Sequence, residues 1–244
     1  MGAALEDFCS AVALDLVTLA QLHDRELDSP TVMALQQERF PRSLAFRLHG
    51  DRGRDVLDTL SSVVARLSDD ATEQDDLAAD FAAIYLTYGL RASPCESVWL
   101  DEDGLAMQEP MFEVRRDYAR LGLQAPDWRV RPDDHLVFQL QFVAALIEEA
   151  DEAAVAEAAR FLDDHTLRWL PDFAGRVAQH AATPFYAALA VLTDTYLDEL
   201  RDTMARMLGE PRPTAEEIEQ RNRRVGEGAG PEASAYVPGS APSW

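Results

Sequence analysis

The sequence predicts an all-α protein, a single-domain helical bundle of about nine or ten helices with a flexible acidic C-terminal tail. Apolar residues recur at intervals of three and four along most of the chain, and no long segment alternates apolar and polar residues as a strand would. Hydrophobic residues make up 47% of the 244 residues, which is enough for a sizeable core. We therefore expect a helical domain over residues 1–208 and a charged, Gly-, Pro- and Ser-rich tail over 209–244.

In the first third of the chain, apolar stripes at helical spacing predict helices over residues 5–24, after Ser29-Pro30, over 54–67 and over 72–89. Asp28 supports the second of these helices, because it is a capping residue placed before a proline at a helix start. Pro41 should break the chain before another short segment that runs to about Leu48, and residues 49–53 should form a turn.

In the rest of the chain, helices are expected over residues 109–121, from a cap at Asp133 onward, and over 151–164, 166–180 and 184–208. Residues 90–107 and 123–132 should form loops, because prolines interrupt both segments. The charged segment 214–224 lacks an apolar stripe, although it can still be helical. The last twenty residues are rich in Gly, Pro, Ala and Ser and are predicted to be disordered.

The charge of the chain is unusual, with 44 acidic residues against 22 basic residues, all of which are Arg. A surface this acidic repels phosphate backbones, which disfavours nucleic-acid binding, and it attracts basic peptides. Acidic surfaces with little Lys also suit proteins kept soluble in concentrated salt, so we expect a salt-loving host. Net charge alone therefore does not identify a partner.

The sequence carries no recognisable targeting signal, metal motif or catalytic motif. No basic residue precedes Arg25 and no uncharged apolar run is long enough to span a membrane, so we expect a cytoplasmic protein without stable membrane insertion. The two cysteines and five histidines do not have the spacing of metal ligands, and no phosphate loop, dinucleotide-binding glycine motif or nucleophile elbow occurs. These absences favour a binding protein over an enzyme, and we expect neither a metal nor a cofactor.

Three segments carry residues that a plain helical scaffold does not need: Asp80-Phe81 with Tyr85, Pro94-Cys95-Glu96-Ser97-Val98-Trp99, and Pro132-Asp133-Asp134-His135. Each segment has a structural interpretation: the first is a solvated acid beside core aromatics, the second is a loop that covers the core, and the third is a helix cap. Each also has a functional one, because an apolar rim beside carboxylates can receive a basic peptide. Carboxylates pair with guanidinium groups in a strong bidentate form.

In this order, the segments resemble the TorD/DmsD-type redox-enzyme maturation chaperones, a family related to the nitrate reductase chaperone NarJ. The resemblance spans about residues 5–207 and also includes the following residues: Arg116 with Tyr118, Gly122-Leu123, Phe161-Leu162 with His165, Trp169-Leu170-Pro171 and Phe185-Tyr186. It implies an all-helical chaperone, not an enzyme, without a cofactor. It also implies that the protein binds the twin-arginine signal peptide of a molybdoenzyme precursor, such as a dimethyl sulfoxide or trimethylamine oxide reductase, until the molybdenum cofactor is inserted.

The resemblance carries peptide-binding residues over to Asp80, the loop from Pro94 to Trp99, Asp134 and His135. As a hypothesis, Asp80 and Asp134 pair with the arginines of the signal peptide, and His135 orients Asp134 or donates to a peptide carbonyl. The apolar groove would be lined by Tyr85, Pro94, Val98 and Trp99. The chain departs from the family at Cys95, where relatives often have an aromatic residue, and in the tail after Gly209.

Three alternatives remain open on the sequence. The first is a NarJ-like assembly factor that binds the N-terminus of a non-exported molybdoenzyme subunit. The second is a small nucleotide-binding enzyme, and the third is an acidic scaffold without a peptide groove. The sequence leaves open which reductase is the client and whether the protein is a monomer or a homodimer.

Overall fold

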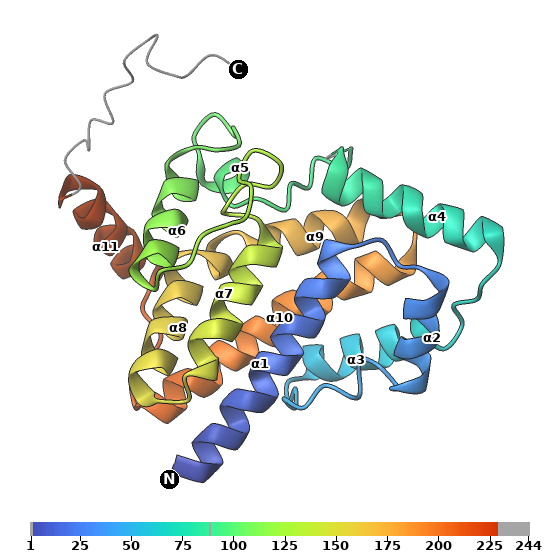
Figure 1. The fold of residues 1–244 in the computed structure, drawn as a ribbon, viewed down its shortest axis with the longest axis horizontal. Helices are drawn as coiled ribbons and strands as arrows, with labels where there is room; N and C mark the ends of the chain where they lie inside the picture. The colour runs from blue at the N-terminus through green and yellow to red at the C-terminus, as the bar shows by residue number, and fades with distance from the viewer. Residues whose placement is uncertain (1, 88, 229–244) are drawn as a thin grey trace. The chain divides into compact units, whose positions relative to one another are not determined.

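The structure, a computed structural model, describes residues 2–87 and 89–228, and it is built from helices (Figure 1). This confirms the all-α prediction, and the described residues contain no strand, only an isolated bridge between Cys95 and His135. The elements are α1 (Gly2–Asp24), α2 (Ser29–Gln37), α3 (Asp51–Val64), α4 (Ala71–Phe81), the π-helical turn η1 (Ala82–Leu86), α5 (Ser97–Leu100), α6 (Glu109–Arg120), α7 (Leu136–Glu148), α8 (Glu152–Asp164), the 3-10 turn η2 (Thr166–Arg168), α9 (Leu170–His180), α10 (Pro184–Leu208) and α11 (Ala215–Gly228).

The chain divides into two units, Met1–Arg212 and Pro213–Trp244. The first unit holds α1 to α10, and the described part of the second is the charged helix α11. The charged segment 214–224 is thus helical, while the disorder expected for the last twenty residues falls largely on 229–244, outside the described residues.

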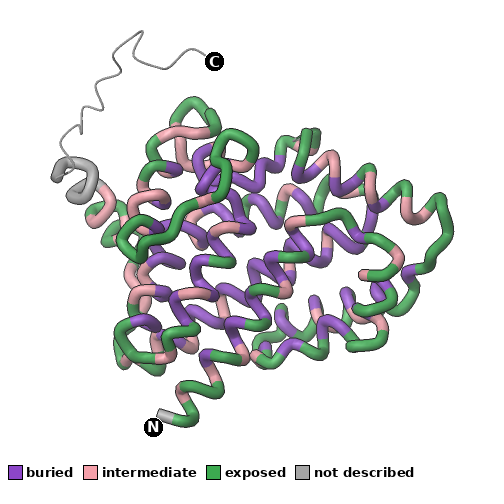
Figure 2. The backbone as a smooth tube through the Cα atoms, in the orientation of Figure 1, coloured by how far each residue is buried: buried purple, intermediate pink, exposed green. Residues whose placement is uncertain are grey.

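Helix α10 forms the core of the first unit. Its Leu189, Leu192, Tyr196 and Leu200 are fully buried, and Figure 2 shows the buried stretches of neighbouring helices turned inward. α10 packs most extensively against α9 and α3, and α1 packs against α7. Burial of each large apolar side chain contributes about 1.5–3 kcal/mol, so these contacts supply most of the driving force for folding.

Several helix starts follow the signals in the sequence. Asp28 caps α2 by accepting from the amide of Thr31 at 2.9 Å, and prolines occupy the first turn of α2 and α10. The expected cap at Asp133 is wrong, because the N-cap of α7 is His135. The Asp133 carboxylate instead pairs with Arg115 at 2.7 Å, and the His135 side chain, two residues later, accepts from the amide of Val137 at the start of the helix.

Two other expectations need correction. The loop 90–107 contains the single-turn helix α5. The helix expected over 72–89 is α-helical only to Phe81 and continues as a π-helical turn. The segment from Leu44 to Gly50 is not helical, and tertiary contacts hold it in place: the Asp15 carboxylate accepts from the amides of Ala45 and Phe46 at 3.0 and 2.8 Å.

Asp80 joins α4 to the start of α10. Its buried carboxylate accepts from the amides of Ala182 and Thr183 at 3.1 and 2.9 Å and from the Thr183 hydroxyl at 2.6 Å. These donors lie at the N-terminus of α10, where the helix dipole also favours a negative charge. Among the described residues, no helix combines the length and the apolar character needed to cross a membrane.

We expect Asp80→Asn to lower the free energy of unfolding by about 1–3 kcal/mol, because the amide replaces a charged acceptor of three hydrogen bonds. Urea denaturation followed by circular dichroism measures this change. Asp75→Asn, on an exposed position of the same helix, is the control and should stay within about 0.5 kcal/mol of the parent protein. Equal stabilities of the two variants would contradict this role for Asp80.

Candidate peptide-binding site

The loop that begins at Pro94 is joined to the start of α7 through the backbone. The amide of Leu136 donates to the carbonyl of Pro94 at 2.8 Å, and the amide of Glu96 donates to the carbonyl of Asp134 at 3.2 Å. These bonds form the bridge between Cys95 and His135. Two segments about forty residues apart in sequence, both singled out by the resemblance, therefore lie side by side.

The Asp134 carboxylate fixes the first turn of α5. Its Oδ2 accepts from the amide of Ser97 at 2.7 Å and from the Ser97 hydroxyl at 2.5 Å. Asp134 is fully buried, and burial raises the pKa of its carboxyl to about 6 although the Ser97 hydrogen bonds act in the opposite direction. Its Oδ1 is buried without a hydrogen-bond partner among the described residues, so one acceptor position remains open.

His135 has a structural position next to Asp134. Its Nδ1 accepts from the amide of Val137 at 3.2 Å, and its ring lies edge-on to Phe138. Burial lowers the pKa of His135 well below its usual value, with Arg131 acting in the same direction. The imidazole is therefore neutral at pH 7 and serves as the cap of α7.

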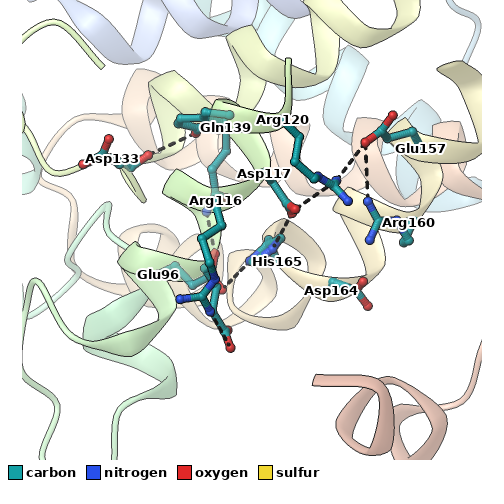
Figure 3. A network of polar contacts seen from close by, with 12 residues as sticks. Glu96, Arg116, Asp117, Arg120, Asp133, Gln139, Glu157, Arg160, Asp164 and His165 are labelled. Atoms are coloured by element: carbon teal, nitrogen blue, oxygen red, sulfur yellow. Dashed lines mark hydrogen bonds and ion pairs between the residues drawn. The ribbon is translucent and has the colours of Figure 1, made fainter. Parts of the chain in front are cut away.

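Behind the loop lies a buried polar network that reaches three helices (Figure 3). His165 lies between two carboxylates, with Nδ1 3.0 Å from Glu96 Oε1 and Nε2 3.1 Å from Asp117 Oδ2. Gln139 donates to the other oxygen of Glu96 at 2.6 Å and accepts from the indole of Trp169 at 3.3 Å. Glu96, Gln139 and Trp169 are fully buried, so the network anchors the loop to the core.

The charge of His165 follows from these neighbours. Burial alone would lower the pKa of this histidine, but the carboxylates of Glu96 and Asp117 raise it to about 10. Asp117 in turn pairs with Arg120 at 2.9 Å, and Arg120 contacts Glu157 at 2.8 Å (Figure 3). At pH 7 both ring nitrogens of His165 therefore donate, and the imidazolium compensates the buried charge of Glu96. Among the described residues, no group of three or more His, Cys, Asp or Glu is arranged to hold a metal ion.

The loop presents two apolar side chains at the surface, Val98 and Trp99, which are partly exposed. The indole of Trp99 donates to the carbonyl of Ser93 at 2.8 Å, and the guanidinium of Arg176 lies 5.9 Å from its ring centre. Pro94 and Cys95 are buried, so in this conformation neither lines an open groove.

Asp80 and Tyr85, the other two predicted residues, lie elsewhere, where α4 and η1 meet α10 and α1. Tyr85 is buried with its hydroxyl 2.6 Å from Nδ1 of His23, whose Nε2 lies 2.8 Å from the Thr193 hydroxyl. Because that hydroxyl donates to the carbonyl of Leu189, it accepts from His23, and Tyr85 donates to Nδ1. Burial lowers the pKa of His23 to about 3, which matches this neutral arrangement.

Six of the eight predicted residues are thus buried, while Val98 and Trp99 remain accessible. The pairing of Asp80 and Asp134 with peptide arginines stays a prediction. The sequence interpretation included Glu96 only as part of the loop from Pro94 to Trp99, and it assigned no site role to Gln139, Asp117 or His165. One signal was present, since Gln139 interrupts the otherwise apolar run Leu136–Leu140 and must find a partner once buried.

We expect the stability of the protein to fall as pH rises between about 7 and 10. His165 keeps its proton up to about pH 10 in the folded protein but loses it near its ordinary value of 6.5 when unfolded. The folded state then binds more protons, and its stability decreases by up to about 1.4 kcal/mol for each pH unit in this window. Urea denaturation at several pH values should show this slope in the parent protein and in the control His180→Gln, but not in His165→Gln. A slope that persists in His165→Gln would contradict the assignment.

We expect Ser97→Ala to loosen the loop and to lower the free energy of unfolding by about 1–2 kcal/mol, because Oδ2 of Asp134 loses one of two donors in a buried site. Hydrogen exchange of the amides from Ser97 to Leu100 should accelerate. Ser62→Ala, at an exposed position of α3, serves as the control and should change neither quantity. Unchanged exchange in Ser97→Ala would show that the hydroxyl does not hold the turn.

Comparison with known proteins identifies the family of this chain. The family model described as nitrate reductase delta subunit matches residues 52–175, about half of the chain, and this range contains all eight predicted residues. The chaperone protein TorD of Actinobacillus pleuropneumoniae serotype 3 is 31% identical over 177 residues, which cover 72% of this chain and 86% of that protein.

Two further relatives, also named chaperone protein TorD, agree with this match. That of Vibrio parahaemolyticus is 31% identical over 148 residues, covering 56% of this chain and 68% of that protein. That of Vibrio cholerae serotype O1 is 31% identical over 160 residues, covering 62% and 72%. All three relatives are thus named chaperones. The chain belongs to the family of the nitrate reductase delta subunit and the TorD-type maturation chaperones.

Proposed function

We propose that this chaperone acts in the cytoplasm, where it binds the twin-arginine signal peptide of a molybdoenzyme precursor and holds the precursor until its molybdenum cofactor is inserted. Such a peptide has a basic segment followed by an apolar segment. Its receptor needs apolar side chains for the second segment and carboxylates for the first. An acidic chain of the TorD family with an anchored apolar turn meets both requirements.

The observation that carries this proposal is the way in which Val98 and Trp99 are held. Both are partly exposed apolar side chains on a turn fixed by the buried Asp134 and Glu96. Preorganised side chains lose little conformational entropy on binding, and tryptophan is among the residues that most often dominate binding energy. The turn therefore offers a rigid contact for the apolar segment of the peptide.

Asp134 has a second part in this proposal. Its Oδ2 holds Ser97 and thereby fixes the turn that presents Val98 and Trp99. Its Oδ1 is buried and has no hydrogen-bond partner among the described residues. The part that Asp134 plays in peptide binding is therefore to position the turn.

One alternative has specific support. The description of the matching family model names a nitrate reductase subunit, which favours a NarJ-like factor that binds the N-terminus of a non-exported enzyme subunit. Replacement of both arginines in the peptide by glutamine separates the two functions, because only signal-peptide recognition should depend on them. The small nucleotide-binding enzyme has no such support, since the relatives are named chaperones.

We expect Trp99→Ala to weaken binding of a client N-terminal peptide at least about tenfold, or about 1.4 kcal/mol. Calorimetric titration of the peptide encoded by a neighbouring molybdoenzyme gene, at low and high salt, measures this change. Trp128→Ala is a matched control, because Trp128 is also partly exposed but lies on the other loop.

Equal losses in the two tryptophan variants would show that the loop after Pro94 is not the contact. Failure of every candidate peptide to bind the folded parent protein at both salt concentrations would refute signal-peptide recognition.

A further inference from the structure

A second concave site lies on the first unit, away from the loop with Trp99. It is an open cavity of about 400 Å³ between the end of α3, the start of α4 and the start of α10. These helix ends lie on the right of Figure 1. Its floor is apolar and consists of the buried side chains of Val63, Leu67, Leu77 and Phe185. We call it the acidic pocket, because Asp70, Glu73 and Asp76 also line it.

Among the described residues, the charge of the acidic pocket is only partly compensated. Arg66 is the one basic residue in its lining, and no ion pair of the described residues joins it to the three carboxylates. Asp76 makes neither a hydrogen bond nor an ion pair with other described residues, while Asp70 caps α4 and Glu73 accepts from Ser68. An apolar floor with an excess of two negative charges suits a side chain that has an apolar stem and a cationic end. Arginine has both, and its guanidinium pairs with carboxylates.

Accessibility distinguishes this pocket from the carboxylates that the sequence favoured. Asp80 and Asp134 are buried, and their oxygens hold the amides of Thr183 and Ser97. A peptide arginine would have to displace those bonds. Asp70 and Asp76 are exposed and have no such bonds with distant segments to lose. Asp80 supports the pocket indirectly, because the residues that donate to it, Ala182 and Thr183, form one wall of the pocket.

The acidic pocket and Trp99 lie at the two ends of one short path. Arg176 on α9 lies over the Trp99 ring, and Ala182, which follows α9, lines the pocket. By helical rise and extended backbone, the Cα atoms of Arg176 and Ala182 are on the order of 10 Å apart, and the Arg176 side chain with the 5.9 Å from its guanidinium to the Trp99 ring lengthens the path to roughly 20–25 Å. An extended peptide covers that distance in about six to eight residues. A single peptide can therefore reach both places.

We propose that the acidic pocket receives arginine side chains of the client peptide while its apolar segment runs toward Val98 and Trp99. This assignment rests on the proposed function and adds the subsite for the basic segment. Specificity for the arginines then resides in Asp70, Glu73 and Asp76, and Arg66 limits the affinity by its like charge.

The test uses the full chain and two synthetic peptides, the N-terminus of a candidate molybdoenzyme with its arginine pair and the same peptide with both arginines replaced by glutamine. The variant Asp70→Asn, Glu73→Gln, Asp76→Asn keeps a good capping residue at position 70. By calorimetry at fixed low salt, it should bind the arginine peptide at least about tenfold more weakly and the glutamine peptide unchanged.

A control variant, Glu148→Gln, Glu149→Gln, Asp172→Asn, makes the same change in net charge at exposed positions outside the pocket and should lose less than about threefold. Asp76→Asn alone, which removes no internal hydrogen bond, should weaken the arginine peptide about threefold, and Arg66→Gln should tighten it by a similar factor.

Equal losses in the pocket and control variants, or an equal loss for both peptides, would overturn the assignment. If Trp99→Ala still weakens binding in that case, the proposed function stands and only the arginine subsite is wrong. If the parent protein binds neither peptide, both the subsite and the proposed function fail.

Discussion

Helix α10 is the constraint on which the remainder of the first unit depends. Its inward side chains are buried along most of its length, and separate parts of the chain are bonded to it: α4 through Asp80, the turn before α3 through Glu199, and α8 through the bidentate pair between Asp163 and Arg201 at 2.7 and 3.0 Å. The Asp163–Arg201 pair is almost fully buried, so removal of either partner would leave an uncompensated charge in the core. The bonds of Asp80 position α4, and the packing of α9 against α10 positions Arg176 beside Trp99, so both proposed peptide contacts depend on α10.

The carboxylates of this very acidic chain divide into two kinds. Buried ones such as Asp15, Asp80 and Asp134 accept hydrogen bonds from backbone amides and join segments that lie far apart in sequence. Exposed ones keep the surface negative and remain available to cations. The 44 acidic residues therefore include carboxylates that a basic partner cannot reach. It is the division between the two kinds, rather than the total charge, that determines where a basic peptide can bind.

Most of the fold could be predicted from the sequence because it is local. Apolar periodicity located the long helices, and caps such as Asp28 located their starts. The four-residue helix α5 could not be predicted, since its first turn is held by Asp134, whose bond to Ser97 spans 37 residues. The same limit applies to the candidate site. Motifs found the loop and the acids beside it, but the burial of Asp80 depends on Thr183, and the network around Glu96 depends on His165. Neither partner is near in sequence.

The π-helical turn after α4 has a consequence for how this region can change in evolution. The amide of Thr87 donates to the carbonyl of Ala82, five residues earlier, at 2.8 Å, so this turn holds more residues than an α-helical turn. Deletion of one residue between Ala82 and Leu86 could restore a regular helix, but it would rotate the following chain by about 100° relative to Phe81. The loop that leads to Pro94 would then leave this turn in another direction. A change in the length of this turn would therefore redirect the entry to the loop.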